Sequence, residues 1–248
     1  MKRALVEKLP SPGHPIALAD EEAHHLMQVL RIRNAERIEA LDGRGAKMTV
    51  EVEFLGKAKA QIHARGEVVR DASLGALPIT LEMAVLKGDA MEWTVEKAVE
   101  LGVRTFVPVL CAHAVVQVDR KGPDFYRERW QKIADQALKQ CGRLERMEVR
   151  APIELTALLT EKRALRLWAD EGARAESPHV FEALAKTEAA DRVRGGVAIL
   201  IGPEGGWSEA ERTLLARSEC RSTSLGPWVY RAETAALFAT SLVAASMR

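Results

Sequence analysis

The sequence has few of the features that mark secreted, membrane or metal-binding chains. Its three cysteines, Cys111, Cys141 and Cys220, are far apart and form no C-x-x-C pair. Such spacing predicts reduced thiols in a cytoplasmic protein, with neither a disulfide framework nor a metal site. No apolar run reaches the roughly 18 residues of a membrane span, and the first twenty residues lack the apolar stretch of a secretory signal. We therefore expect a cytoplasmic chain with no membrane segment and no bound metal.

A large excess of one charge is also missing. The formal net charge is +1, which excludes a polycation that binds nucleic acid by charge alone. The segment Gln117–Arg150 nevertheless has more Lys and Arg than Asp and Glu, and Ala151–Cys220 has the opposite excess. A locally basic segment can contact phosphates, although a solvated helix face explains the same composition equally well.

The pattern of the chain changes near residue 74. Residues 1–73 consist of short strand-like stretches, interrupted by one helical stretch at Asp20–Ile32 and by a tight-turn signal at Asp42–Gly45. This pattern predicts a small β-rich domain. The small residues, Gly and Pro of "DASLGALP" then indicate a domain boundary.

Residues 74–248 alternate between strand-like and helical stretches. The strand-like ones are "ITLEMAVL", "RTFVPVL", "ALRLWAD", "VAILI" and "RSTSL", and the helical ones include "AMEWTVEKAVELG", residues 125–141, "HVFEALAK" and the C-terminal "TAALFATSLVAASM". Such alternation predicts the α/β class, with a mainly parallel sheet covered by helices. We expect Asp89 to cap the first of these helices, Gly102 to end it, and Trp93 and Trp130 to lie in the core.

Two glycine-proline turns follow two of the predicted strands, at Gly202-Pro203 and Gly226-Pro227. The first lies in "ILIGPEGGWSEAE", where Ser208 and Glu211 predict a capping box. This stretch has neither a G-x-G-x-x-G spacing nor a G-K-[ST] ending. Because ligands of open α/β sheets bind at the carboxyl ends of strands, two such turns without Lys indicate an adenosine held without its phosphates. Two ordinary turns remain the alternative.

The predicted C-terminal helix is apolar or small on nearly every side after Thr234. A helix with this composition is usually buried. We expect it to be buried against a second subunit or within loops of the same chain.

These motifs together resemble a known family. "IGPEGGWSEAE" followed by "SLGPWVYRAETAAL" is similar to two motifs of the SPOUT methyltransferases, and more narrowly to the RsmE family, which methylates N3 of a uridine in 16S ribosomal RNA. "HHLMQVLRIR" and "LDGRG" resemble the N-terminal PUA-like domain of that family. "LKGDAMEWTVEKAVELGV" and "KIADQALKQCGR" match its catalytic domain in order.

The resemblance implies a PUA-like β-barrel RNA-binding domain at residues 1–73 and a SPOUT domain with a deep trefoil knot at residues 74–248. It further implies that S-adenosyl-L-methionine (SAM) binds in the knot, that the chain acts as a homodimer, and that its substrate is 16S rRNA of the small ribosomal subunit. Gly202, Gly206 and Gly226 are expected to let the backbone approach SAM closely.

The resemblance also assigns site residues. The expected cofactor-binding residues are Ala169, Ile201, Gly202, Gly206, Leu225, Gly226, Val229 and Tyr230. Arg231 is the expected catalytic residue, and the expected RNA-binding residues are Arg31, Arg33, Gln140, Arg143 and Trp228, of which Gln140 and Arg143 are alternatively dimer-facing. The family often has Arg at the position of Trp228 and an aliphatic residue at that of Tyr230.

The implied chemistry is an in-line methyl transfer to a uridine whose N3 must lose a proton. A guanidinium beside a carbonyl oxygen of the base favours the resulting anion, and we expect Arg231 to have this role. Glu204, Glu233 or water are the candidate proton acceptors, and Trp207 and Trp228 are available to hold the base. Two alternatives stay open: a SPOUT enzyme with another target atom, such as a ribose 2′-hydroxyl, and a non-catalytic RNA-binding assembly factor.

Overall fold

The computed structural model describes residues 2–56, 59–114, 121–172 and 177–247. The chain divides into two compact units. The first contains the residues up to Gly75 together with Asp135–Arg146, and the second contains Ala76–Ala134 and the residues from Met147 onward.

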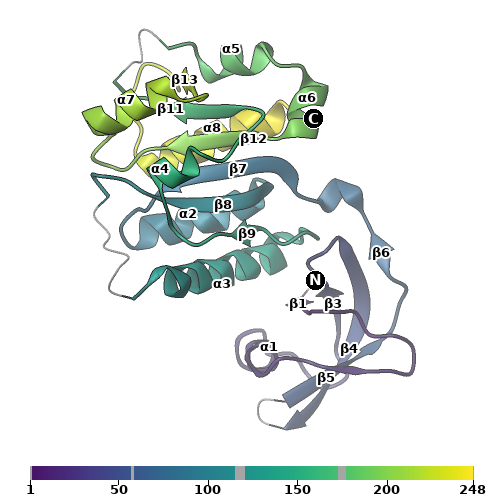
Figure 1. Ribbon diagram of the computed structural model, residues 1–248. Coiled ribbons are helices and arrows are strands. Elements are labelled where there is room, and N and C mark those ends of the chain that lie inside the picture. Colours follow the sequence, from purple (N-terminus) through teal and green to yellow (C-terminus); the bar gives the residue numbers. More distant parts are fainter. Residues whose placement is uncertain (1, 57–58, 115–120, 173–176, 248) are drawn as a thin grey trace. The chain divides into compact units, whose positions relative to one another are not determined.

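The first unit is built mainly from strands, as the sequence predicts (Figure 1). They are β1 (Arg3–Leu5), β2 (Ile16–Ala17), β3 (Arg37–Leu41), β4 (Ala46–Gly56), β5 (Lys59–Ala64) and β6 (Val69–Arg70), followed by the short 3₁₀ turn η2 (Ala72–Leu74). The sheet order is β1-β3-β4-β5-β2, with β6 also paired to β4. Alternate residues of β4, Met48, Val50 and Val52, are buried, which gives the strand one core face and one outer face.

The expected turn at Asp42–Gly45 joins β3 to β4. The carboxylate Oδ1 of Asp42 accepts hydrogen bonds from the backbone N–H of Arg44 at 2.7 Å and of Ala46 at 2.9 Å. A side chain that bonds the backbone two residues ahead is the usual reason for Asp in such turns.

The prediction of a single helix at Asp20–Ile32 is partly wrong. The chain forms α1 (Asp20–His24), then the π-helical turn η1 (His25–Val29), and leaves the helix at Leu30. The Leu30 N–H donates to the carbonyl of His25, five residues back, at 3.1 Å. Of the apolar residues at helical spacing in this stretch, Ala23 and Leu26 are buried, and Met27 and Leu30 are half-buried.

The second unit contains a parallel sheet and seven helices, counting only the elements that the structure describes (Figure 1). Its strands are β7 (Leu77–Ala84), β8 (Val103–Leu110), β9 (Glu148–Val149), β10 (Ile153–Glu154), β11 (Arg166–Ala169), β12 (Val197–Ile201) and β13 (Arg221–Thr223). Its helices are α2 (Asp89–Glu100), α3 (Pro123–Cys141), which continues into the first unit, α4 (Leu155–Leu158), α5 (Val180–Ala185), α6 (Ala189–Gly195), α7 (Glu209–Arg217) and α8 (Ala232–Ala245).

The sheet order is β10-β8-β7-β12-β11-β13, with β9 also on β8, and every strand pair is parallel. The predicted α/β class is therefore confirmed. Sequence reasoning missed the short elements α4, α6, β9 and β10, which carry too few residues for a periodic pattern.

Helix α8 packs on the central strands β7 and β12 and on α2 and α5. Ala232, Ala235, Ala236, Ala239, Thr240 and Val243 are its buried residues. Leu237, Phe238 and Leu242 are only half-buried, so the chain by itself does not bury the helix on every side. The end of α8 is held by Arg192, whose guanidinium donates to the carbonyls of Ser246 at 2.8 Å and Leu184 at 2.7 Å.

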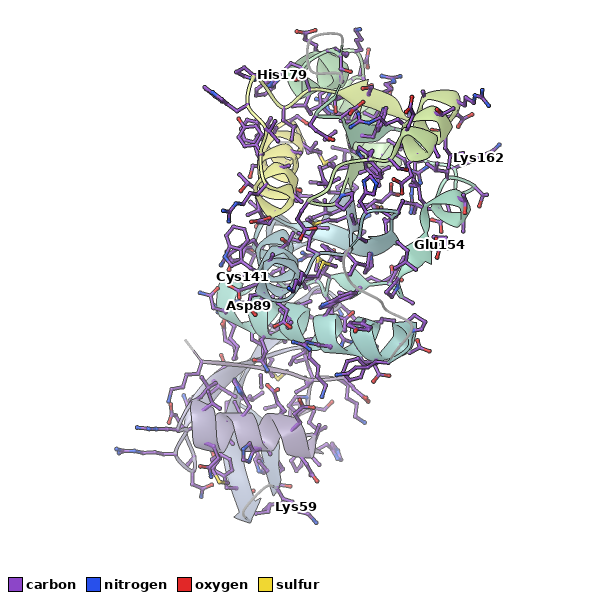
Figure 2. All side chains as sticks on the ribbon, turned by 90° about the vertical axis from the view of Figure 1, so that its left-hand side faces the viewer. Lys59, Asp89, Cys141, Glu154, Lys162 and His179 are labelled. Atoms are coloured by element: carbon purple, nitrogen blue, oxygen red, sulfur yellow. The ribbon has the colours of Figure 1, made fainter. Side chains whose placement is uncertain are left out.

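Two details of α2 differ from the sequence-based expectation. Asp89 is the first residue of the helix (Figure 2), and the N-cap is Gly88, without a side-chain hydrogen bond. Trp93 is 44% exposed, whereas Trp130 on α3 is buried as expected. Helical spacing alone did not distinguish the two tryptophans, because it fixes a face of a helix but not what that face packs against.

The three cysteines are free thiols, and burial raises the pKa of the Cys111 and Cys220 thiols. Within the described ranges, no helix has the length and apolar content needed to span a bilayer. No group of three or more His, Cys, Asp or Glu in those ranges is arranged to hold a metal ion.

A buried ion pair crosses the centre of the parallel sheet. Glu82 on β7 has no exposed surface, and it accepts two hydrogen bonds from Arg166 on β11, at 2.8 and 3.1 Å. The strand β12 lies between them, and Arg166 is in register with Ala198 on that strand. Removing one partner of such a pair leaves the other charge buried and uncompensated.

We expect Glu82→Leu to lower the free energy of unfolding by about 3–5 kcal/mol, measured by urea denaturation. Asp191→Ala, which removes an exposed ion pair with Arg194, is the matched control and should change little. Equal stability of Glu82→Leu and wild type would contradict this account of the sheet.

Candidate functional site

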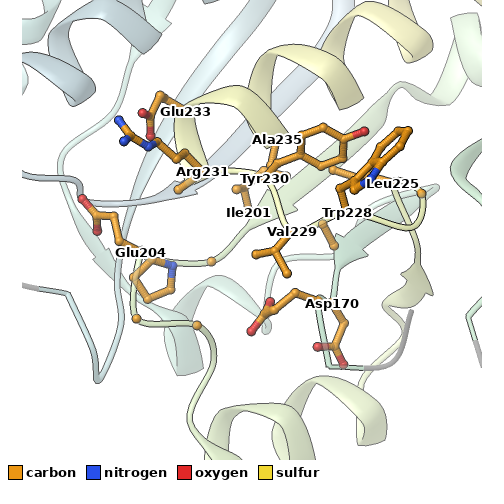
Figure 3. A pocket seen from close by; sticks show the side chains of 18 of the residues that line it. Asp170, Ile201, Glu204, Leu225, Trp228, Val229, Tyr230, Arg231, Glu233 and Ala235 are labelled. Carbon is orange, nitrogen blue, oxygen red and sulfur yellow. The ribbon is translucent and has the colours of Figure 1, made fainter. Parts of the chain in front are cut away.

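A cavity of about 730 Å³ opens at the carboxyl ends of three neighbouring strands, β11, β12 and β13 (Figure 3). Its lining consists of Ala169–Glu171, Ile201–Gly206, Thr223, Leu225, Gly226, Trp228–Glu233 and Ala235, with Ala90 from α2. The two glycine-proline turns therefore face one cavity, at the end of the sheet where ligands of open α/β folds bind.

The turn after β12 has a well-defined backbone. The Gly206 N–H donates to the Pro203 carbonyl at 2.9 Å. Ser208 and Glu211 then form the predicted capping box: the Ser208 hydroxyl accepts from the Glu211 N–H, and the Glu211 carboxylate accepts from the Ser208 N–H. His113 on the loop after β8 contacts the Gly206 carbonyl through Nδ1 at 3.0 Å, so this histidine braces the turn.

Trp207 forms a wall of the site from within the protein. Its indole is buried, stands 6.2 Å from the Trp168 ring, and donates from Nε1 to the Ala169 carbonyl at 3.0 Å. The expectation that Trp207 holds a base is therefore wrong, because its ring is packed and its N–H is used. A Cβ at Gly202 would lie 2.8 Å from the Trp207 ring, which is too close for any side chain.

The other glycine of this turn is also explained by the protein itself. Gly206 has φ +71°, and a Cβ there would lie 2.5 Å from the Glu171 carboxylate. Packing within the protein therefore favours glycine at position 202, and packing and a positive φ favour it at position 206. The close approach of a ligand, which the sequence suggested, is an additional reason for glycine at both positions.

The loop after β13 forms the opposite wall. Leu225 is buried, whereas Trp228 is 70% exposed and Val229 is similarly open. The Tyr230 ring lies 5.5 Å from the Phe238 ring of α8, which ties the end of this loop to the helix. Trp228 is thus more open to a ligand or nucleic acid than Tyr230, which is half-buried.

Arg231 stands at the N-cap position of α8 and is exposed. Figure 3 shows it on the same side of the cavity as Glu204 and Glu233. Among the described residues it forms no ion pair, either with the neighbouring Glu233 or with another acid. Its charge is available to whatever enters the cavity.

A second group of charges was missed by the sequence reasoning. Asp170 and Glu171 directly follow β11 and line the cavity. Arg212 on α7 pairs with both, with its Nη2 2.6 Å from Glu171 Oε1 and its Nη1 on Asp170 Oδ1. The available signal was the position of two consecutive acids at the end of a predicted strand.

The structure brings together all eight expected cofactor-binding residues, together with Arg231 and Trp228, around this cavity. The other expected RNA-binding residues belong to the first unit. Arg31 and Arg33 are exposed on either side of the buried Ile32, and Gln140 is exposed. Arg143 is 6% exposed, so RNA can reach its side chain only after a rearrangement.

Comparison with known proteins places this architecture in a family. A family model described as RNA methyltransferase domain matches residues 74–244, and one described as RNA methyltransferase PUA domain matches residues 18–64. The chain is 28% identical over 243 residues to ribosomal RNA small subunit methyltransferase E of Bacillus subtilis, covering 96% of this chain and 91% of the relative. The protein of the same name from Synechocystis is 27% identical over 89% of this chain and 69% of its own length.

Two solved structures are similar over nearly their whole length. One is a putative methyltransferase of Legionella pneumophila in complex with SAM, with a TM-score of 0.87 and 29% identity over 98% of this chain and 96% of that one. The other is ribosomal RNA small subunit methyltransferase E of Neisseria gonorrhoeae bound to SAM, with a TM-score of 0.84 and 28% identity over the same shares. The chain therefore belongs to the RsmE family of RNA methyltransferases, which combines a PUA domain with the RNA methyltransferase domain.

Proposed function

We propose that the chain is a SAM-dependent methyltransferase that modifies N3 of a uridine in 16S ribosomal RNA. The observation that carries the proposal is the cavity between the two glycine-proline turns. Its volume of about 730 Å³ lies within the roughly 300–1,000 Å³ of small-molecule sites. Arg231 is the one cation in the described lining, which suits a nucleoside without phosphates better than a nucleotide. The SAM complexes of the similar structures support the same ligand.

We further propose that the chain is knotted around this cavity. Strand β13 lies at the edge of the sheet, whereas α8 packs on the central strands β7 and β12. Residues 224–231 must therefore return from the edge to the centre, and they line the same cavity as the turn after β12. A segment threaded past that turn is the arrangement that a trefoil knot requires.

A homodimer is proposed for the same region. Leu237, Phe238 and Leu242 leave apolar surface on α8 that the chain only half buries. A second subunit would cover this surface.

The cytoplasmic location expected from the sequence stays a prediction.

The proposed domains are a PUA-like domain at residues 1–73 and the catalytic domain at residues 74–248. We propose that Arg31 and Arg33 of the first domain and Gln140 of the second contribute phosphate contacts, because these exposed polar side chains suit binding to an RNA backbone. Arg143 is the weakest member of the proposed RNA-binding set because it is buried.

Within the catalytic domain, the position of Arg231 in the cavity lining supports the role proposed for it. When bound, SAM supplies an activated methyl group on a sulfonium. The N3–carbon bond forms as the sulfur–carbon bond breaks, and the N3 proton must leave. The Arg231 guanidinium, unpaired within the described part of the chain, stabilises the negative charge on N3, O2 and O4 of the base.

The N3 proton needs an acceptor near Arg231. Glu204 and Glu233 both line that side of the cavity (Figure 3), and Glu204 Oε1 is 3.5 Å from the backbone N of Lys87. Either carboxylate, or a water bound by them, can take the proton. The base itself must leave its stack to reach the site, and Trp228 offers the exposed ring on which it stacks.

Calorimetry with SAM and its product S-adenosylhomocysteine separates the enzyme from a non-catalytic assembly factor. We expect saturable one-site binding of both ligands. Mapping of methylated nucleotides in 16S rRNA from a deletion strain should then reveal one uridine that lacks N3 methylation. Loss of a ribose methyl group would favour the other SPOUT reaction, and an unchanged modification pattern with no SAM binding would favour the assembly factor.

We expect Arg231→Ala to lower kcat for RNA methylation by about 100- to 1,000-fold, the usual loss when a group that stabilises a developing anion is removed. The dissociation constant for S-adenosylhomocysteine should stay near the wild-type value. Arg217→Ala, which removes an exposed arginine of α7 outside the cavity, is the matched control. A near wild-type rate in Arg231→Ala with normal cofactor binding would refute the assignment.

We expect Trp228→Ala to raise KM for RNA by roughly 10- to 100-fold, since base stacking on an aromatic ring contributes about 1–3 kcal/mol. Trp228→Phe should keep most of the affinity, because a ring remains. Steady-state kinetics with a 16S rRNA fragment or small subunits measures both variants. If Trp228→Ala leaves KM unchanged, the ring does not hold the base.

A further inference from the structure

Asp170 is a buried carboxylate at the edge of the cavity, directly after β11. It is 7% exposed, and it is part of the cavity lining. One of its oxygens, Oδ1, accepts a hydrogen bond from the Gly172 N–H at 2.9 Å and pairs with Nη1 of Arg212. The side chain is therefore fixed in place by two donors on a single oxygen.

The other oxygen of Asp170, Oδ2, has no hydrogen-bond donor among the residues that the structure describes. An ionised carboxylate only accepts hydrogen bonds. Oδ2 is thus an acceptor, held rigidly beside the cavity, that a ligand donor can satisfy. The candidate donors on SAM are the ribose hydroxyls, the adenine amino group and the ammonium of the methionine part.

The charges around Asp170 argue against the methionine part. A second carboxylate, Glu171, lines the cavity beside it, and the guanidinium of Arg212 is shared between the two acids. The carboxylate of a bound methionine would face these two acids. Arg231, the cation of the described lining, lies on the other side of the cavity (Figure 3).

The position of Asp170 fits a ribose. In the dinucleotide-binding members of the open α/β folds, a carboxylate accepts a hydrogen bond from a ribose hydroxyl of the ligand. We propose that Asp170 Oδ2 binds the 2′- and 3′-hydroxyls of the adenosine part of the methyl donor and so selects a ribonucleoside. This inference rests on the proposed SAM binding and names the group that recognises the sugar.

Arg212 is a positioning residue for this contact. Its Nε donates to the Trp207 carbonyl at 3.3 Å, while its two terminal nitrogens hold Asp170 and Glu171. Gly172 leaves room for it, because a Cβ there would overlap the guanidinium. The guanidinium of Arg212 therefore orients Asp170 through Oδ1, and Oδ2 stays available to the ligand.

The test is calorimetry with 5′-methylthioadenosine, which keeps the adenosine but lacks the amino acid, and with its 2′-deoxy and 3′-deoxy forms. We expect wild type to bind at least one deoxy form about 10- to 100-fold more weakly than the parent, the usual loss of a hydrogen bond to a charged group. Asp170→Ala should bind the parent more weakly by a similar factor and should no longer distinguish it from that deoxy form. Asp170→Asn keeps the shape of the side chain, and its ratio of the dissociation constants for the deoxy form and the parent should lie between those of wild type and Asp170→Ala. Arg212→Ala should lower this ratio without bringing it to one.

Asp191→Ala, which removes an exposed carboxylate of α6 outside the cavity, is the control and should keep the wild-type ratio. Wild type that does not distinguish the parent from either deoxy form overturns the inference. An Asp170→Ala variant that still prefers the parent over the deoxy form as strongly as wild type also overturns the inference. The same holds for an Asp170→Ala variant that no longer binds S-adenosylhomocysteine but still binds 5′-methylthioadenosine, because the partner of Asp170 would then be the ammonium of the methionine part. If wild type binds neither 5′-methylthioadenosine nor S-adenosylhomocysteine, the proposed function itself fails.

Discussion

The site depends on the packing of one side chain, the indole of Trp207. It fills the space above Gly202, stacks edge-on against Trp168 of β11 and donates its N–H to the Ala169 carbonyl. The turn after β12 is thereby fixed to the end of β11 by a hydrogen bond and by close-packed rings. Because a Cβ at Gly202 would overlap the indole, this wall of the cavity is closely packed.

The opposite wall has a different character. The loop after β13 keeps Leu225 buried but exposes Trp228 and Val229, and it is anchored through Tyr230 to α8. A rigid wall that recognises a small ligand and an open wall with an exposed ring suit a site with two substrates. In the proposed reaction, the methyl donor is held by the turns, and the nucleobase approaches beside Trp228 and Arg231. The charges divide in the same way, with the Arg212 pairs on one side and, on the other, Arg231, which forms no ion pair with any described residue.

The sequence predicted the parallel α/β unit because its strands are long apolar runs and its helices have clear periodicity. It predicted the cavity because glycine and proline mark strand ends, and parallel strands bring those ends together. It missed Asp170, Glu171 and Arg212, since ion pairs between α7 and the end of β11 depend on tertiary packing that no local pattern encodes. It also named Trp207 as available to hold the base, because the exposure of an aromatic residue cannot be read from its position beside a glycine turn. For the same reason Trp93 was expected in the core and is exposed.

The account requires that the space between the turn after β12 and the loop after β13 is where the methyl donor binds. A crystal structure of the chain grown with S-adenosylhomocysteine tests this most directly. We predict density for one ligand in that space, with its adenosine between the Gly202 turn and the Gly226 loop and its sulfur facing the side of the cavity that carries Arg231. Density for the ligand at any other place, or a cavity closed by the side chains around it, would contradict the account.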